Sequence, residues 1–256
     1  MRTVTILVLF FATWLSACRG KGETGKTMEE SESPAVDSSL PGSQREAAAA
    51  RRVTPELRGA LEAMGMSFGA PVYLRAFKEE KELEVWVKKN NADEFGLFRT
   101  YKIARQSGGL GPKLTEGDGQ VPEGFYFVPP GAMKPDSVYH LAFNVGFPNA
   151  FDQSLSRTGS NIMVHGNKVS VGCLAMTDEK IEEIYTLCSA AHEKGQAFFR
   201  IHIFPFRMTD MRLQREKENQ WFGFWSNLKE INDQFEKTKI PPNVTVQNGR
   251  YVFDNR

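Results

Sequence analysis

Hydrophobic and polar residues alternate along much of the chain after Gly69, which is the pattern of half-buried β-strands. The alternation first predicts two strands, Val72–Phe77 and Leu83–Val87, separated by a charged turn as in a hairpin. Further strands are expected, in chain order, within GLFRTYKIA, FYFVPP, VYHLAFNV, NIMVHG and AFFRIHIF. The closing segment VTVQNGRYVF has Asn-Gly between two alternating runs and predicts a hairpin. We therefore expect a domain rich in β-structure.

Three other segments have helical spacing. The clearest is Thr177–Gly195, which has a capping residue at its start and a glycine that can end it. Met208–Lys239 predicts one long amphipathic helix whose aromatic residues pack into the core. A shorter helix can form from Ala47 and continue through PELRGALEAMG, with Pro55 near its start.

The N-terminus has the layout of an export signal: one arginine, an apolar run, and small residues that end in Cys18. The apolar run is too short for a permanent membrane-spanning helix. LSAC resembles the lipobox of bacterial lipoproteins, in which the signal is removed before an acylated cysteine; an ordinary signal with an incidental Cys18 is the alternative. We expect a signal peptide at residues 1–17. A lipidated Cys18 and a flexible tether should then span residues 18–55, because their polar composition cannot bury a core.

Composition narrows the possible partners. With 32 basic and 31 acidic residues the formal net charge is +1, so no overall field attracts the protein to nucleic acid. The glycine-rich stretch at residues 107–124 lacks the GKS or GKT ending of a phosphate-binding loop, and no helix follows it. No basic groove accompanies the aromatic residues of the long helix. We therefore expect neither nucleic-acid nor nucleotide binding.

An exported compartment is oxidising, so Cys173 and Cys188 could form a disulfide. Helical spacing instead places Cys188 on the core face of the helix at residues 177–195. His165 lies eight residues before Cys173, a spacing that suits a strand, a turn and a return in which the two side chains meet. Spacing alone leaves two interpretations of Cys173 open: a buried structural thiol, or a nucleophile activated by His165.

A nucleophilic cysteine also needs donors for the oxyanion that forms when it attacks a carbonyl. The amides of Gly172, Cys173 and Leu174 are the candidates, because a glycine lets the backbone approach a substrate. A metal site is a weaker interpretation, since His140 and His202 lie at spacings that match no zinc pattern.

The segment HGNKVSVGCLAM resembles the active-site signature of the YkuD-type L,D-transpeptidase catalytic domain. Within that family, a YafK-like murein branch is similar over about residues 66–253. The similar segments follow in order: YLRAFKEEKELEVWVK, SGGLGPKLTEGDGQVPEGFY, NVGFPNAFD, IMVHG, VSVGCLAMTD, IEEIY, FPFRMTD and PPNVTVQNGRYVF.

The resemblance implies an α+β fold, namely a mixed-sheet β-sandwich with a helix after the nucleophile and a C-terminal helix plus hairpin. It implies a catalytic domain at residues 56–206 and an extension at residues 207–256 packed on it. By position, Cys173 matches the nucleophile, His165 the base, Gly172 with Cys173 the oxyanion site, and Ser170 a hydrogen-bonding loop residue. No metal or other cofactor is implied.

Two positions depart from the wider family signature. Val171 stands where that signature has histidine, and Ala175 stands where it has arginine. The YafK-like branch that the chain resembles shares both departures. Arg157 and Arg207 are candidates to supply the missing charge to a substrate, although each can equally be a structural arginine. His140 is a third candidate for the cleft, with a structural role as the alternative.

The resemblance also implies the substrate: the stem peptide of peptidoglycan, attacked at the diaminopimelate carbonyl to form a thioester. Hydrolysis, which trims a stem or releases a peptidoglycan-linked lipoprotein, is favoured over transpeptidation, which crosslinks stems or attaches a lipoprotein. A non-catalytic peptidoglycan-binding lipoprotein is the alternative from another class, motivated by the arginine missing at Ala175. We expect a monomer that faces the periplasm and is held in a membrane by its N-terminal lipid. The expected membrane is the outer membrane of a Gram-negative bacterium.

Overall fold

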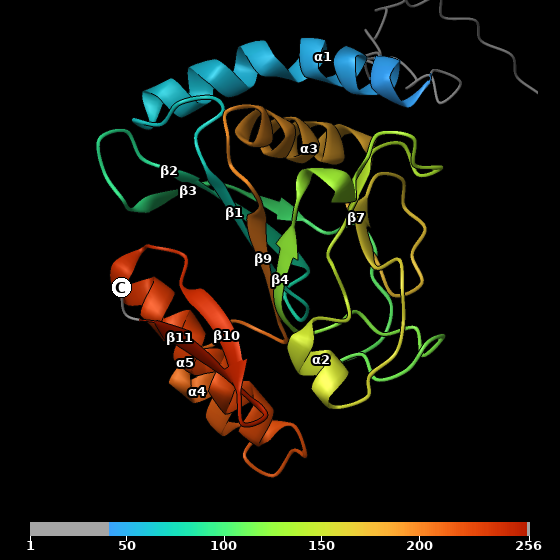
Figure 1. Ribbon diagram of the computed structural model, residues 1–256, viewed down its shortest axis with the longest axis vertical. Coiled ribbons are helices and arrows are strands. Elements are labelled where there is room, and N and C mark those ends of the chain that lie inside the picture. Colours follow the sequence, from blue (N-terminus) through green and yellow to red (C-terminus); the bar gives the residue numbers. More distant parts are fainter. Residues whose placement is uncertain (1–40, 255–256) are drawn as a thin grey trace, which may run out of the picture. The chain divides into compact units, whose positions relative to one another are not determined.

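The computed structural model describes residues 41–254 (Figure 1). The expected signal peptide, Cys18 and most of the expected tether lie outside these residues. Five strands form the larger sheet in the order β3-β2-β1-β9-β4. They are β1 (Val72–Phe77), β2 (Glu82–Lys88), β3 (Phe95–Lys102), β4 (Gly124–Val128) and β9 (Phe199–Phe204). Only β1 and β9 are parallel, so the sheet is mixed.

A smaller sheet has the order β5-β6-β7-β8. Its strands are β5 (Met133–Lys134), which follows the short 3-10 helix η1 (Pro130–Ala132), then β6 (Ala142–Asn144), β7 (Met163–His165) and β8 (Leu174–Ala175). Here β7 and β8 are parallel, and the other neighbours are antiparallel. The two sheets share one hydrophobic core, which confirms the expected α+β architecture with mixed sheets.

Two helices cover this core and lie side by side (Figure 1). They are α1 (Gly42–Ala63) and α3 (Asp178–Glu193). Leu57 and Leu61 of α1 and Ile184 of α3 are fully buried in it. Because α1 begins at Gly42 and contains Pro55 in its interior, the boundary that we expected between tether and domain at residue 55 is wrong. Segment 42–55 is part of the helix that packs on α3, and its Ala49 is fully buried in the shared core.

The C-terminal segment builds a second core on the larger sheet (Figure 1). It contains α4 (Asp210–Gln214), α5 (Phe222–Thr238) and the hairpin of β10 (Asn243–Gln247) and β11 (Arg250–Asp254). The hairpin is confirmed: Asn248 and Gly249 both have positive φ, as a two-residue type I′ turn requires. Trp225, Leu228 and Ile231 of α5 are fully buried against Phe77 and Phe204 of the sheet.

One long helix over Met208–Lys239 was expected, and this prediction is wrong because the chain forms two helices there. Asn219 accepts a hydrogen bond from the amide of Trp221 through its side chain at 3.0 Å, in place of a helical carbonyl. Such local side-chain bonds compete with helix continuation. None of the helices between residues 41 and 254 is long and apolar enough to cross a bilayer.

Candidate active site

The parallel strands β7 and β8 position the two residues that the sequence singled out. Val164 pairs with Leu174, and His165 pairs with Ala175. Side chains alternate between the two faces of a sheet, and Val164 and Leu174 point into the shared core. His165 and Ala175 therefore lie on the opposite face, and Cys173 directly precedes β8.

His165 is held in one tautomer. Its Nδ1 lies 2.6 Å from the carbonyl oxygen of Gly166, and a carbonyl can only accept a hydrogen bond. Nδ1 therefore carries the proton, and Nε2 keeps the lone pair that a general base uses. Burial lowers the pKa of His165, against the smaller opposing effect of the Gly166 carbonyl, so the imidazole is neutral near pH 7.

The turn after His165 requires glycine. A Cβ on Gly166 would lie 2.5 Å from Asp178 Oδ1 and 2.8 Å from the carbonyl oxygen of Tyr139. Asp178 begins α3 and accepts a hydrogen bond from the amide of Asn167 at 2.6 Å. This contact ties the end of β7 to the start of α3 and fixes the carbonyl that orients His165.

Tyr139 covers the imidazole of His165. The two rings lie 4.8 Å apart between centroids at an interplanar angle of 32°, and Tyr139 itself is 39% exposed. Sequence reasoning did not identify Tyr139, because nothing in its local pattern distinguishes it from the other tyrosines of the chain.

Cys173 is a free, half-buried thiol. Its Sγ accepts a hydrogen bond from the amide of Met163 at 3.4 Å and lies 3.6 Å from the carbonyl oxygen of Asn161. Burial raises the pKa of Cys173, while the Met163 amide and the charge of Lys113 act in the opposite direction. Cys188 is also free and fully buried in α3, which confirms its expected core position and excludes the disulfide.

Within residues 41–254, no hydrogen bond joins the thiol of Cys173 to the imidazole of His165. The raised thiol pKa and the lowered imidazole pKa describe a neutral pair at rest rather than a thiolate–imidazolium pair. Catalytic hydrogen bonds are often long or absent before a substrate is bound, so this geometry is compatible with a nucleophile and its base.

The amides expected to form the oxyanion site have partners in this structure. The amide of Gly172 donates to Ser107 Oγ at 2.6 Å, and that of Cys173 donates to Ser170 Oγ at 3.1 Å. Ser170 also donates to the carbonyl oxygen of Cys173 at 2.6 Å, so its expected role as a hydrogen-bonding loop residue agrees with these contacts. An oxyanion can reach the two amides only by displacing the serine hydroxyls.

Ser107 joins two loops. Besides accepting from Gly172, its hydroxyl donates to the carbonyl oxygen of Gly119 at 2.7 Å. The glycine-rich loop at residues 107–124 is thereby fixed against residues 166–173, the cysteine loop between β7 and β8. Gly172 has φ of +85°, a conformation that side-chain-bearing residues rarely adopt.

Lys113 belongs to the same glycine-rich loop and is 3% exposed. Its Nζ donates to Asp118 Oδ1 at 2.7 Å and to the carbonyl oxygen of Thr115 at 2.8 Å. A Cβ on Gly159 would lie 2.5 Å from Lys113 Cε, so the lysine passes close to the segment that contacts Cys173 through Asn161. Sequence reasoning missed Lys113, because its place beside the cysteine depends on how two loops fold together.

The three other predicted site residues have structural partners. His140 is buried, has φ of +72° outside the strand in which we expected it, and its Nε2 lies 2.8 Å from Glu182 Oε1. Arg157 is buried and pairs with Asp152 at 2.8 Å. Arg207 pairs with Glu82 and Glu84 and lies over the ring of Phe77. The structure brings none of these three into contact with Cys173 or His165.

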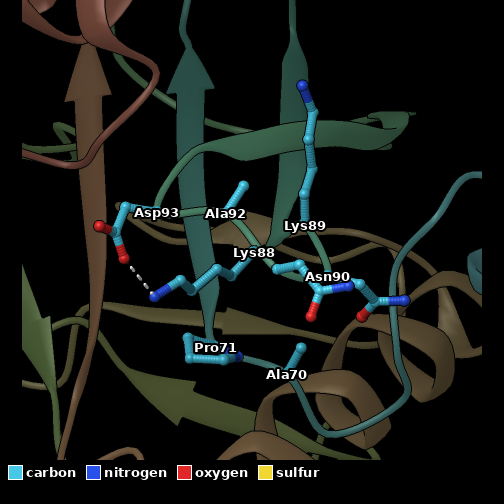
Figure 2. Close-up of a pocket in the computed structure, with 8 residues that line it drawn as sticks. Ala70, Pro71, Lys88, Lys89, Asn90, Ala92 and Asp93 are labelled. Atoms are coloured by element: carbon cyan, nitrogen blue, oxygen red, sulfur yellow. Dashed lines mark hydrogen bonds and ion pairs between the residues drawn. The ribbon is translucent and has the colours of Figure 1, made fainter.

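A surface hollow of about 570 Å³ lies elsewhere, at the turn between β2 and β3 (Figure 2). Ala70, Pro71 and residues 88–93 line it. Figure 2 shows Lys88 directed at Asp93, with which it pairs at 2.8 Å. No residue of the cysteine loop contributes to this hollow, so it is separate from the candidate active site. Among residues 41–254, no cluster of three or more His, Cys, Asp or Glu side chains could hold a metal ion.

The chain is similar to known proteins. The family model described as the L,D-transpeptidase catalytic domain, YkuD, matches residues 73–203, which include both His165 and Cys173. The chain is 47% identical over 184 residues to a protein of Escherichia coli K12 named "Putative L,D-transpeptidase YafK". This similarity covers 72% of the chain and 74% of the relative.

Several solved structures also match, among them the following two. One is the helical cell shape determining protein Pgp2 of Campylobacter jejuni, as a K307A mutant, at 18% identity and a TM-score of 0.43. The match covers 77% of this chain and 66% of that one. The other is Bd1075 of Bdellovibrio bacteriovorus, at 19% identity and a TM-score of 0.39, with coverage of 73% and 83%.

Proposed function

Because the chain belongs to the YkuD family of L,D-transpeptidase catalytic domains, we propose that it is a cysteine enzyme acting on peptidoglycan stem peptides. The bond attacked is the amide at the L-centre carbonyl of diaminopimelate. The observation that carries the proposal is the pairing of β7 with β8. It places the strand that follows the free thiol of Cys173 next to the strand that carries His165, whose Nε2 is held unprotonated.

In the proposed reaction, His165 Nε2 takes the proton of the Cys173 thiol as the sulfur attacks the carbonyl carbon. The electron pair of the carbonyl moves to its oxygen, and the amides of Gly172 and Cys173 receive this oxyanion after exchanging their serine partners. The tetrahedral intermediate then collapses to a thioester. The proton on His165 passes to the departing amine, which leaves the acyl group on Cys173.

The acceptor of the acyl group decides the outcome. Water gives hydrolysis, which trims a stem or releases a peptidoglycan-linked lipoprotein. An amine gives a crosslink or an attached lipoprotein. We favour hydrolysis because the resemblance is to the YafK-like branch, and the partly exposed Cys173 supports it by leaving the thioester within reach of water.

A non-catalytic peptidoglycan-binding protein is the second candidate, because Ala175 stands where the wider family has an arginine. A binding protein would not need the single tautomer of His165 or the network of Ser170 around Cys173. These contacts favour the enzyme.

The test is to incubate the full chain with purified muropeptides and with lipoprotein-linked peptidoglycan, and to analyse the products by mass. Trimmed stems or released lipoprotein that disappear in the Cys173→Ala variant are expected. Crosslinked products instead would support the transpeptidase, and the absence of any product that depends on Cys173 would support the binding protein.

The periplasmic location and the lipid anchor are parts of the same proposal and rest on LSAC at residues 15–18. Growth with an alkyne-tagged fatty acid should label the chain and should fail to label a Cys18→Ser variant. Labelling of both would contradict lipidation at Cys18.

A further inference from the structure

Five residues form one row across the smaller sheet. The strand registers pair Lys134 with Ala142, Ala142 with His165, and His165 with Ala175. An isolated antiparallel bridge then pairs Ala175 with Arg105. The amide of Arg105 donates to Ala175 at 3.2 Å, and the amide of Ala175 donates back to Arg105 at 3.0 Å. Arg105 therefore continues the sheet as the neighbour of Ala175.

Directly paired residues in a sheet have their side chains on the same face. The neighbouring residues Val164 and Leu174 point into the core, so the row points away from it. Arg105 thus lies on the face that carries His165, with only the methyl group of Ala175 between them.

The distances of an ordinary sheet bring Arg105 within reach of the nucleophile. A pair that exchanges both hydrogen bonds has Cα atoms about 5.5 Å apart. Cys173 directly precedes β8 and lies two residues before Ala175, which adds at most about 7 Å. The long side chain of Arg105 can span the remaining gap and place its guanidinium above the thiol.

Arg105 differs from the other arginines considered for this role. Arg157 and Arg207 are both paired with carboxylates. Arg105 is exposed and makes no side-chain hydrogen bond, ion pair or ring contact with another residue in the range 41–254. Ala175 is fully buried, so a charged side chain has no room at that position. Arg105, on the neighbouring segment, can supply the positive charge instead.

We propose that Arg105 binds a carboxylate of the substrate next to the bond that is cleaved. A guanidinium presents two parallel N–H donors that match the two oxygens of a carboxylate. This inference rests on the proposed function, because it takes the stem peptide as the substrate. Two carboxylates are candidates: that of the diaminopimelate side chain and the C-terminal one of the residue that leaves. Peptides amidated at one or the other distinguish them.

The test measures binding of stem tetrapeptides to the full chain in which Cys173→Ala prevents turnover. The peptides carry both carboxylates, or an amide at the diaminopimelate side chain, at the C-terminus, or at both. Arg105→Gln should weaken binding of the fully charged peptide about 10- to 100-fold, the range of a charge-assisted hydrogen bond. It should leave the doubly amidated peptide unchanged. Arg105→Lys should retain part of the affinity, and the amidated peptide that already binds weakly identifies the carboxylate.

Arg51→Gln is the matched control, because Arg51 is an exposed arginine on α1 and its loss should change no affinity. Equal affinity of Arg105→Gln and its parent for the charged peptide would overturn the inference and leave the proposed function intact. So would an equal loss of affinity for the doubly amidated peptide. Failure of the parent to bind any stem peptide would overturn the proposed substrate, and the inference with it.

Discussion

Replacing Gly166 by alanine should damage both the stability and the activity of the protein. The new Cβ would lie 2.5 Å from Asp178 Oδ1 and 2.8 Å from the carbonyl oxygen of Tyr139, so the backbone or the carboxylate must move. Asp178 then loses the 2.6 Å hydrogen bond from Asn167. The Gly166 carbonyl that holds Nδ1 of His165 moves as well.

The loss of stability can be worked out from the lost hydrogen bond to Asp178 and from the extra methyl group. A hydrogen bond to a charged group contributes about 1.5–3 kcal/mol, and an extra methyl group in a packed site costs about 1–3 kcal/mol. The free energy of unfolding of Gly166→Ala should therefore fall by about 2.5–6 kcal/mol. A displacement of His165 by about 1 Å should also lower turnover roughly 100-fold.

Gly59→Ala is the matched control. Gly59 lies in α1, is exposed, and a Cβ there would meet nothing within 4 Å. Alanine is favoured over glycine in a helix by about 1 kcal/mol, so this variant should be slightly more stable and fully active. Urea unfolding followed by circular dichroism measures both changes, and stem-peptide cleavage measures activity. Unchanged stability and turnover in Gly166→Ala would refute the role given to the contact with Asp178.

Three further predictions concern the thiol and its base. Iodoacetamide should label Cys173 in the folded chain, whereas Cys188 should react only after unfolding, because it is fully buried and burial raises its pKa far above that of an ordinary thiol. Lys113→Met should raise the pKa of Cys173 and slow its labelling at a fixed pH, because the cation that favours the thiolate is lost, and Lys113→Arg should restore it. The acid limb of the pH profile of kcat/KM should have its midpoint below 6.5, because burial lowers the pKa of His165 and the base stays unprotonated to lower pH.

Each of these has a contradicting result. Equal labelling of the two cysteines in the folded chain would show that Cys173 is no more accessible than Cys188. An unchanged labelling profile in Lys113→Met would show that Lys113 only packs the loop, and peptide mass mapping assigns the label in both experiments. An acid limb above pH 6.5 would mean that a charged neighbour, rather than burial, controls His165.

Local sequence patterns correctly predicted those helices, strands and turns that depend mainly on neighbouring residues. Alternation identified the strands of the larger sheet, Asn248–Gly249 marked the closing hairpin, and helical spacing identified α3 with Cys188 on its core face. The pattern failed where a distant partner decides the structure. Residues 18–55 have the composition of a tether, but residues 42–55 belong to α1, which begins before the helix expected from Ala47 and packs against α3.

The candidate site divides in the same way. Cys173 and His165 lie close in the sequence, and their motif was sufficient to select them as candidates. Ser107, Lys113 and Tyr139 come from other loops, and only the paired strands and folded loops bring them to the site. The arginines chosen from the sequence, Arg157 and Arg207, proved to be paired with carboxylates, because a sequence shows the charges but not their partners.

The most direct test of the proposed acyl-enzyme mechanism is intact-mass analysis of the full chain during turnover of a stem tetrapeptide or of lipoprotein-linked muropeptides. We expect a transient acyl adduct on Cys173, absent in Cys173→Ala, and a cleaved product formed at a rate that collapses in His165→Ala. Product formation that survives Cys173→Ala, or the absence of both adduct and product with every peptidoglycan substrate, would contradict it.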